Sequence, residues 1–236
     1  RGVVGWAELE VRGSADAGLD GRWLPTVRDA PGVGAAAPVL ERRSYLFVAQ
    51  ARLGVSVRGV DPQAEGELRP FSIVAGRQLE AGDTQAALLS YAAAVELDAG
   101  PGSDVSLLTP EGVEVLRVVG VYHPLGDGAV SERVVQLWLP QAQALFAAGR
   151  DVLTRIDVAT DGSPVGVVAE NLRYVTTDAV TVGRAAAAAG DLAAASRGLR
   201  TMLLGAGLLA LLAAGVLISV YVRAMVAERS VDLGLL

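Results

Sequence analysis

Hydrophobic and polar positions along the first sixty residues predict several strands around one short helix. Residues 3–12, VVGWAELEVR, alternate partly with period two, which is typical of a half-buried strand. A turn rich in Gly and Asp follows, and residues 21–33, GRWLPTVRDAPGV, predict a short helix. Further strands are expected in residues 34–50 and 52–60, before the turn signal Asp61-Pro62. The chain therefore opens as β-α-β with extra strands.

The middle of the chain has short apolar runs separated by Gly, Pro and Asp, which predicts further strands. We expect these strands in residues 86–90, 103–109 and 112–122, with Thr109-Pro110-Glu111-Gly112 as the hairpin turn between the last two. One helix, residues 90–97, interrupts them. This pattern predicts a mostly-β lobe over residues 60–128.

A second β-α-β pattern follows this lobe. Residues 133–140 predict a strand that leads into a short helix at 141–149, and residues 152–160 predict another strand. A helix at 163–175 and a strand at 178–183 complete the pattern. Two β-α-β halves on either side of an inserted lobe predict an α+β fold with a split ferredoxin-like, porter-like lobe. Its first half is residues 1–59, its insert residues 60–128 and its second half residues 129–182.

The remaining sequence predicts a helical stalk followed by a membrane span. In the Ala-rich residues 183–201, apolar side chains recur at alternating steps of four and three, as in a coiled coil, at Ala188, Leu192, Ala195, Leu199 and Met202. An amphipathic helix lying against the lobes is the alternative for this segment. Residues 202–222 contain no charge and would extend roughly 31 Å as a helix, enough to cross a bilayer core of about 30 Å. A buried helix of a larger soluble domain is the alternative for that segment.

Within the predicted span, small residues at four-residue spacing would allow another helix to approach closely. These candidate helix-packing residues are Ala206, Ala210 and Ala214. The chain starts at Arg1 and stops inside a predicted helix, residues 223–236, so we interpret it as a fragment of a longer protein.

Composition excludes several classes of function. The net charge is −6 with no basic stripe, so we expect no nucleic-acid partner. All 20 basic residues are Arg, and the usual phosphate-binding loop requires a Lys, so we do not expect this chain to hydrolyse ATP itself. The chain has no Cys, which rules out disulfides and thiol chemistry.

A search for catalytic chemistry gives little. His123 is the only His, and without Cys it cannot build a zinc site alone. Residues 32–37, GVGAAA, lack the third Gly of a dinucleotide fingerprint and are better interpreted as a loop that leads into a strand. Glu80 and Asp83 are more simply turn formers than an acid/base pair. We expect no catalytic residue, no cofactor and no metal site.

Six further segments carry information through their order and spacing. They are GVDP (59–62), IVAGRQLEAGD (73–83), AALLSYAAAVEL (86–97), GSDVSLL (102–108), LRVVGVY (116–122) and VVQLWLPQAQALF (134–146). Together they resemble the extracytoplasmic core domain of MacB/FtsX-type ABC transporter permeases. The order and spacing match that family from about residue 59 onward, and the similarity is weak before it.

The last ten residues, AERSVDLGLL, are similar to the ERxxEIGLLRA segment after the second transmembrane helix of that family. Asp232 stands where Glu is usual, and the chain stops before the expected Arg. The resemblance implies a cytoplasmic coupling helix that docks on an ATPase, and a plain juxtamembrane helix end is the alternative. The residues on matching positions are Glu228, Arg229, Asp232, Gly234, Leu235 and Leu236.

The resemblance also implies partners and a location. They would be an ABC ATPase subunit, a second permease copy or a paralogue, and the lipid bilayer of the bacterial inner membrane. Residues 1–201 would lie outside the cytoplasm. The family function would be export or mechanotransmission powered by the partner's ATP hydrolysis, and the cargo stays open. The rival interpretation is the ectodomain of a membrane-spanning receptor or sensor, and a membrane-anchored enzyme is a third class.

Overall fold

A computed structural model describes residues 7–13, 18–69, 71–124, 132–146, 149, 151–176 and 180–185. The chain divides into two compact units, Arg1–Ala186 and Ala187–Leu236. The predicted span at 202–222, the coupling helix at 223–236 and the stalk beyond residue 185 lie outside the described residues. None of the helices that the structure describes is long and apolar enough to cross a membrane.

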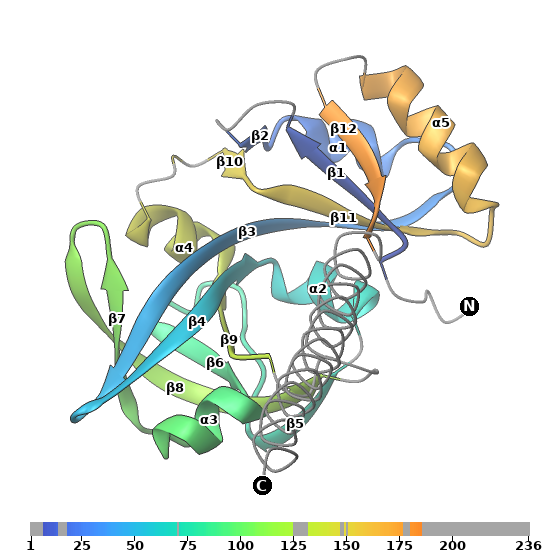
Figure 1. Ribbon diagram of the computed structural model, residues 1–236. Coiled ribbons are helices and arrows are strands. Elements are labelled where there is room, and N and C mark those ends of the chain that lie inside the picture. The colour runs from blue at the N-terminus through green and yellow to red at the C-terminus, as the bar shows by residue number, and fades with distance from the viewer. Residues whose placement is uncertain are drawn as a thin grey trace, which may run out of the picture. The chain divides into compact units, whose positions relative to one another are not determined.

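The first unit contains a ten-stranded sheet, a small two-stranded sheet and five described helices (Figure 1). The strands are β1 (Leu9–Gly13), β2 (Leu19–Asp20), β3 (Val33–Val48), β4 (Ala51–Val60), β5 (Phe71–Gly76), β6 (Ala86–Ser90), β7 (Asp104–Thr109), β8 (Gly112–Pro124), β9 (Val134–Trp138), β10 (Val152–Leu153), β11 (Arg155–Thr160) and β12 (Val180–Arg184). The helices are α1 (Trp23–Arg28), α2 (Pro62–Leu68), α3 (Tyr91–Leu97), α4 (Leu139–Leu145) and α5 (Val165–Thr176).

Four strands form the ferredoxin-like lobe in the order β12-β1-β11-β3, with every neighbouring pair antiparallel. Helices α1 and α5 cover one face of these strands, and their apolar side chains share a core with β1 and β11, including Val27, Val168 and Ile156. A β-α-β half from each end of the described chain thus completes one sheet (Figure 1). The predicted α+β fold with a split ferredoxin-like lobe is confirmed.

The second lobe continues the same sheet as β3-β4-β9-β6-β8-β5, with β7 paired to both β3 and β8. Its main core lies beneath α3 and α4 and includes Leu46, Val57, Leu107 and Leu137. Residues on both sides of the predicted boundaries at 59/60 and 128/129 contribute to this core, because β4 pairs in parallel with β9.

Strand β3 belongs to both lobes. Its first half pairs with β11 up to Val39, and from Val39 to Val48 it pairs with β4. A continuous hydrogen-bonded strand of 16 residues therefore joins the two lobes. Leu139 of α4 packs against the cores of both lobes, which adds an apolar contact across the same junction.

The chain enters and leaves the ferredoxin-like lobe at one place. Leu9 of β1 pairs with Arg184 of β12, and the backbone N–H of Ala185 donates to the carbonyl of Glu8 at 3.1 Å. Strand β12 extends through Gly183 and Arg184, the first two residues assigned to the stalk by sequence. Ala185, the last described residue, therefore lies beside the start of β1.

The interpretation of Asp61-Pro62 as a turn is wrong, because these residues begin helix α2. The Asp61 side chain accepts hydrogen bonds from the backbone N–H groups of Gln63 and Ala64, at 3.1 and 3.4 Å, and Pro62 occupies the first helical turn. The second lobe thus contains two helices in the stretch where one was expected. It also contains β5, to which the sequence pattern assigned no element.

Candidate functional site

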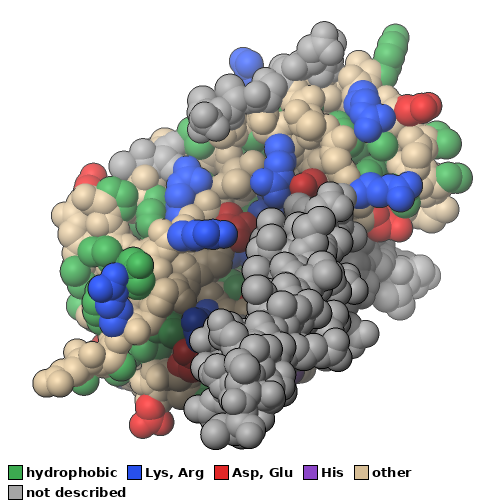
Figure 2. All heavy atoms as spheres, viewed as in Figure 1, with side chains coloured by type: hydrophobic (Ala, Val, Ile, Leu, Met, Phe, Trp, Pro, Cys, Tyr) green, Lys and Arg blue, Asp and Glu red, His purple; other side chains and the backbone are tan. Residues whose placement is uncertain are grey.

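Charged side chains gather on the sheet face opposite the core helices, where the two lobes meet. Helix α2 lies on this face, and its Ala64 and Leu68 pack against Ala37 of β3 and Ala159 of β11. Figure 2 shows blue arginine and red acidic side chains distributed along the visible face of the molecule. Six side chains at the meeting point of the lobes are linked by ion pairs, and we call them the charge network: Glu41 of β3, Arg58 of β4, Glu65 of α2, Arg69 directly after α2, and Arg155 and Asp157 of β11.

Arg155 and Asp157 are two positions apart on β11 and therefore project from the same face of the sheet. The Nε of Arg155 donates to Oδ1 of Asp157 at 2.8 Å, and its Nη1 makes an ion pair with Glu41. Oδ2 of Asp157 lies 2.8 Å from Nη2 of Arg69 without a well-aligned hydrogen bond, so this contact is an ion pair. Asp157 therefore connects β11 to the end of α2.

The network continues from α2 to β4. Oε1 of Glu65 lies 3.3 Å from Nη1 of Arg69 and 3.8 Å from Nη1 of Arg58. Both oxygens of Glu41 are also engaged, because Oε1 accepts a hydrogen bond from Ser56 at 2.8 Å and Oε2 pairs with Arg155. Three carboxylates and three guanidiniums thus form a chain of contacts without net charge.

The network is buried at its centre. The side chains of Asp157, Glu65 and Arg155 are 1%, 2% and 8% exposed. Desolvation opposes the attraction in such a site, so a buried ion pair adds little stability compared with an apolar pair, whereas loss of one partner is costly. We therefore interpret the network as a device that fixes the position of α2 and β4 against β11.

The electrostatic environment of Glu41 keeps it ionised. Burial on its own would raise the pKa of the Glu41 carboxyl, but the charge and hydrogen bond of Arg155, the charge of Arg58 and the Ser56 hydroxyl outweigh burial. Together they lower this pKa from 4.5 to about 2. For Arg155, burial lowers the pKa, and the charges of Asp157 and Glu41 raise it by more, so that the guanidinium stays charged.

The pKa of Glu41 predicts how stability depends on pH. Since the pKa is lowered in the folded state, the ionised carboxyl stabilises the fold above pH 4.5, and this contribution disappears as the pH falls from 4.5 towards 2. We expect Glu41→Gln to lower the free energy of unfolding at pH 6 by about 2 kcal/mol, a value reduced for solvent screening. Denaturant unfolding at several pH values checks this, because the difference between wild type and variant should shrink below pH 4.5. A difference that stays constant down to pH 2 would contradict it.

The residues singled out by sequence are not part of this network. The proposed coupling residues Glu228, Arg229, Asp232, Gly234 and Leu235 lie outside the described residues, as do Ala206, Ala210 and Ala214. These assignments stay predictions.

Four other residues considered for chemistry, His123, Glu80, Asp83 and Gly32, lie within the described part of the chain. The ring of His123 stacks on Tyr91, with centroids 5.7 Å apart. Asp83 closes a turn by accepting the backbone N–H of Glu80 at 2.9 Å and also pairs with Arg77 at 2.7 Å, which confirms the interpretation of Glu80 and Asp83 as turn formers. Gly32, with φ of 88°, directly precedes β3, as expected for a loop that leads into a strand.

Sequence reasoning missed the whole charge network. The available signal was Arg-x-Asp at 155–157 in a strand whose other side chains up to Ala159 are apolar, because two charges two positions apart share one face. For a single strand considered alone, two charges at this spacing are also typical of a face that is exposed to solvent. Only the position of α2 over β11 shows that these charges are buried.

Fold and site together define an α+β domain in which one continuous sheet and a buried charge network join a split ferredoxin-like lobe to a second lobe. The sequence profile of the MacB-like periplasmic core domain matches residues 6–194, so the chain belongs to this family. None of the curated proteins matches the chain.

Solved structures show the same fold. The chain resembles the extracellular domain of the ABC-type transporter YknZ from Gram-positive bacteria, with 13% identity and a TM-score of 0.58 over 74% of this chain and 98% of that one. It also resembles the periplasmic region of MacB from Actinobacillus actinomycetemcomitans, with 14% identity and a TM-score of 0.59 over 79% and 92%. A domain of a putative permease from Porphyromonas gingivalis matches with 13% identity and a TM-score of 0.52 over 75% and 89%.

Proposed function

We propose that this chain is part of the permease subunit of an ABC transporter of the MacB/FtsX type. In this proposal a partner ATPase hydrolyses ATP, and the resulting motion moves the extracytoplasmic lobes for export or mechanotransmission. The observation that carries the proposal is the β1–β12 pair, because it brings Ala185, the last described residue, beside the first strand of the domain. Membership of the MacB-like periplasmic core domain family supports the same assignment.

The architecture favours the transfer of a displacement of β12 to the second lobe. The alternative would be that rearrangement within the domain absorbs this displacement. A force on β12 acts on β1, β11 and β3 through backbone hydrogen bonds, and β3 is itself part of the second lobe. The charge network reinforces this path by fixing α2 and β4 to β11. Relative motion of the lobes would expose buried charges, which costs free energy.

The proposal assigns residues 223–236 to the cytoplasmic side, as the helix that docks on the ATPase. Glu228, Arg229, Asp232, Gly234 and Leu235 are the contact residues in this proposal. The row of Ala206, Ala210 and Ala214 would pack the span against another helix of the same permease or of a second copy in the bilayer.

Co-purification of the full-length protein with the ATPase encoded beside it tests this proposal. We expect the double variant Glu228→Arg, Gly234→Trp to lose the ATPase while the protein stays folded in the membrane. The matched control is Glu111→Arg, Gly166→Trp, which places the same two changes on exposed positions of the domain, and a Cβ at Gly166 would meet no atom within 4 Å. Unchanged ATPase binding in the first variant, or no ATPase partner at all, would overturn the proposal and favour a receptor.

A further inference from the structure

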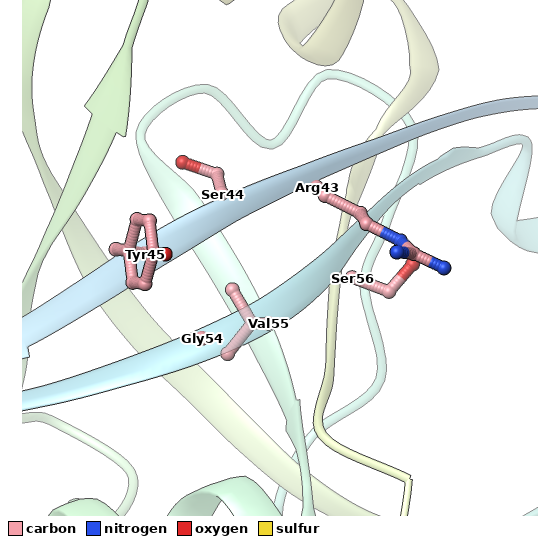
Figure 3. A pocket seen from close by; sticks show the side chains of 6 residues that line it. All are labelled: Arg43, Ser44, Tyr45, Gly54, Val55 and Ser56. Carbon is pink, nitrogen blue, oxygen red and sulfur yellow. The ribbon is translucent and has the colours of Figure 1, made fainter.

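A groove on the open face of the sheet, which shares Glu41 and Arg58 with the charge network, has the chemistry of a ligand site. Three cross-strand pairs line it, Glu41 with Arg58, Arg43 with Ser56 and Tyr45 with Gly54. Figure 3 shows the Arg43 side chain extending beside Ser56, with Tyr45 farther along β3. We call this hollow between β3 and β4 the β3–β4 groove.

The groove consists of two adjoining hollows that share Arg43 and Ser56. The first has a volume of about 340 Å³ and is lined by Arg43, Ser44, Tyr45, Gly54, Val55 and Ser56. The second, about 220 Å³, extends towards Arg58 and β9. Small-molecule sites in proteins have volumes of about 300–1,000 Å³, so the groove is large enough for a small ligand.

One end of the groove is cationic. Arg43 is exposed and makes no hydrogen bond or ion pair within the part of the chain that the structure describes. The Nε of Arg58 is buried and has no acceptor among the described residues, although its Nη1 lies 3.8 Å from Glu65. Buried polar groups without a partner call for an explanation, and an anionic ligand oxygen would supply the acceptor.

The acidic residues at this end do not neutralise Arg43. Ser56 and Arg155 already occupy both oxygens of Glu41. Arg133 and Glu132 also line the second hollow, and Arg133 pairs with Glu96 at 2.6 Å. Since Glu132 is an exposed side chain in water, its charge is screened.

The other end of the groove is apolar. The Tyr45 ring is 39% exposed, and the guanidinium of Arg52 lies 3.9 Å from its centroid, which holds the ring in place. Gly54 faces this ring, and a Cβ at Gly54 would lie 3.6 Å from Cε1 of Tyr45. The absence of a side chain at Gly54 therefore keeps the space beside the ring open.

From these observations we infer that the β3–β4 groove binds a small organic anion with one carboxylate or phosphate head and an aromatic or alkyl body. The head lies between Arg43 and Arg58, and the body lies against Tyr45 over Gly54. The groove is a property of the domain itself, so this inference does not depend on coupling to an ATPase.

Saturation-transfer NMR with 4-phenylbutyrate on the full chain in lipid nanodiscs tests the inference, with empty nanodiscs as the blank. We expect saturable binding that Arg43→Gln weakens about tenfold or more, because a charge-assisted hydrogen bond is lost. Gly54→Val should weaken binding similarly by filling the apolar end, and 4-phenylbutanol, which has no charge, should bind about tenfold more weakly than the acid.

The matched control is Arg117→Gln, since Arg117 is an exposed arginine that lines neither hollow. This variant should bind 4-phenylbutyrate like the wild type. Thermal unfolding of each variant verifies that it is folded, and Gly54→Ala replaces Gly54→Val if the latter is not. The inference is overturned by absence of saturable binding to the wild type, by binding that Arg43→Gln and the Gly54 variant leave unchanged, or by equal binding of the alcohol.

Discussion

Replacing Asp157 by Ala is expected to lower the free energy of unfolding by about 3–5 kcal/mol. Asp157 is 1% exposed and lies between two guanidiniums, with Arg155 and Arg69 both 2.8 Å away. Among the residues that the structure describes, its removal leaves Arg155, itself 8% exposed, with Glu41 as its remaining acidic partner and leaves Arg69 with Glu65. Most of the loss in the free energy of unfolding therefore comes from the uncompensated charge. The lost attraction between Asp157 and the two guanidiniums accounts for a smaller part.

Urea unfolding followed by tryptophan fluorescence measures this effect. The control is Asp104→Ala, because Asp104 also pairs with an arginine, Arg117, at 2.9 Å, but both side chains are about 60% exposed. Surface pairs contribute about 0–1 kcal/mol, so the control should change stability by no more than that. Equal losses in the free energy of unfolding of Asp157→Ala and Asp104→Ala would contradict this prediction. They would show that breaking a buried ion pair costs no more than breaking an exposed one.

A double-mutant cycle on Arg69→Met and Asp157→Asn measures the coupling free energy between these two side chains. It separates their mutual attraction from the desolvation cost of each charge. If Asp157 acts mainly through Arg69, the double variant should be less destabilised than the sum of the two single variants. A second cycle on Arg155→Met and Asp157→Asn measures the coupling to the arginine that contacts the other oxygen of the same carboxyl. Comparison of the two cycles shows whether Asp157 is coupled more strongly to Arg69, at the end of α2, or to Arg155 on its own strand.

The sequence pattern predicted the elements that depend on local chemistry. Alternating apolar side chains and turn residues predicted β4, the β7–β8 hairpin and helix α5, because strand periodicity and capping act within a few residues. Helix α2 was missed because Asp followed by Pro suits both a turn and a helix start. The choice between them depends on the packing of Ala64 and Leu68 against the sheet, which is a tertiary contact.

Neither the charge network nor the groove could be predicted in this way. Glu41 and Arg155 are 114 positions apart and meet only because β3 pairs with β11 and β4 at once. The cationic end of the groove likewise requires the register that places Glu41 opposite Arg58, and a slip of one residue would move these side chains to the other face. The periodic pattern of hydrophobic and polar residues therefore lacks the information that decides which residues of distant strands lie opposite one another.

The two glycines of β4 allow a test of how tightly the junction between the lobes is packed. A Cβ at Gly59 would lie 2.5 Å from the Cβ of Ala142 in α4 and 3.4 Å from both Leu139 and Leu40. Leu139 in turn packs against the cores of both lobes. A larger side chain at Gly59 must therefore push α4 away from the sheet at the point where the cores meet.

We expect Gly59→Val to lower the free energy of unfolding by about 3 kcal/mol, the upper part of the usual range for overpacking. Gly54→Val is the matched control on the same strand, because its Cβ would meet only Tyr45, at an ordinary contact distance of 3.6 Å. Val favours strand conformation over Gly, so this control should be neutral or stabilising by about 1 kcal/mol. Urea unfolding compares the two variants. Because Leu139 of α4 packs against the cores of both lobes, a neutral Gly59→Val would contradict the tight packing of this junction and would mean that α4 can move away from the sheet at little cost.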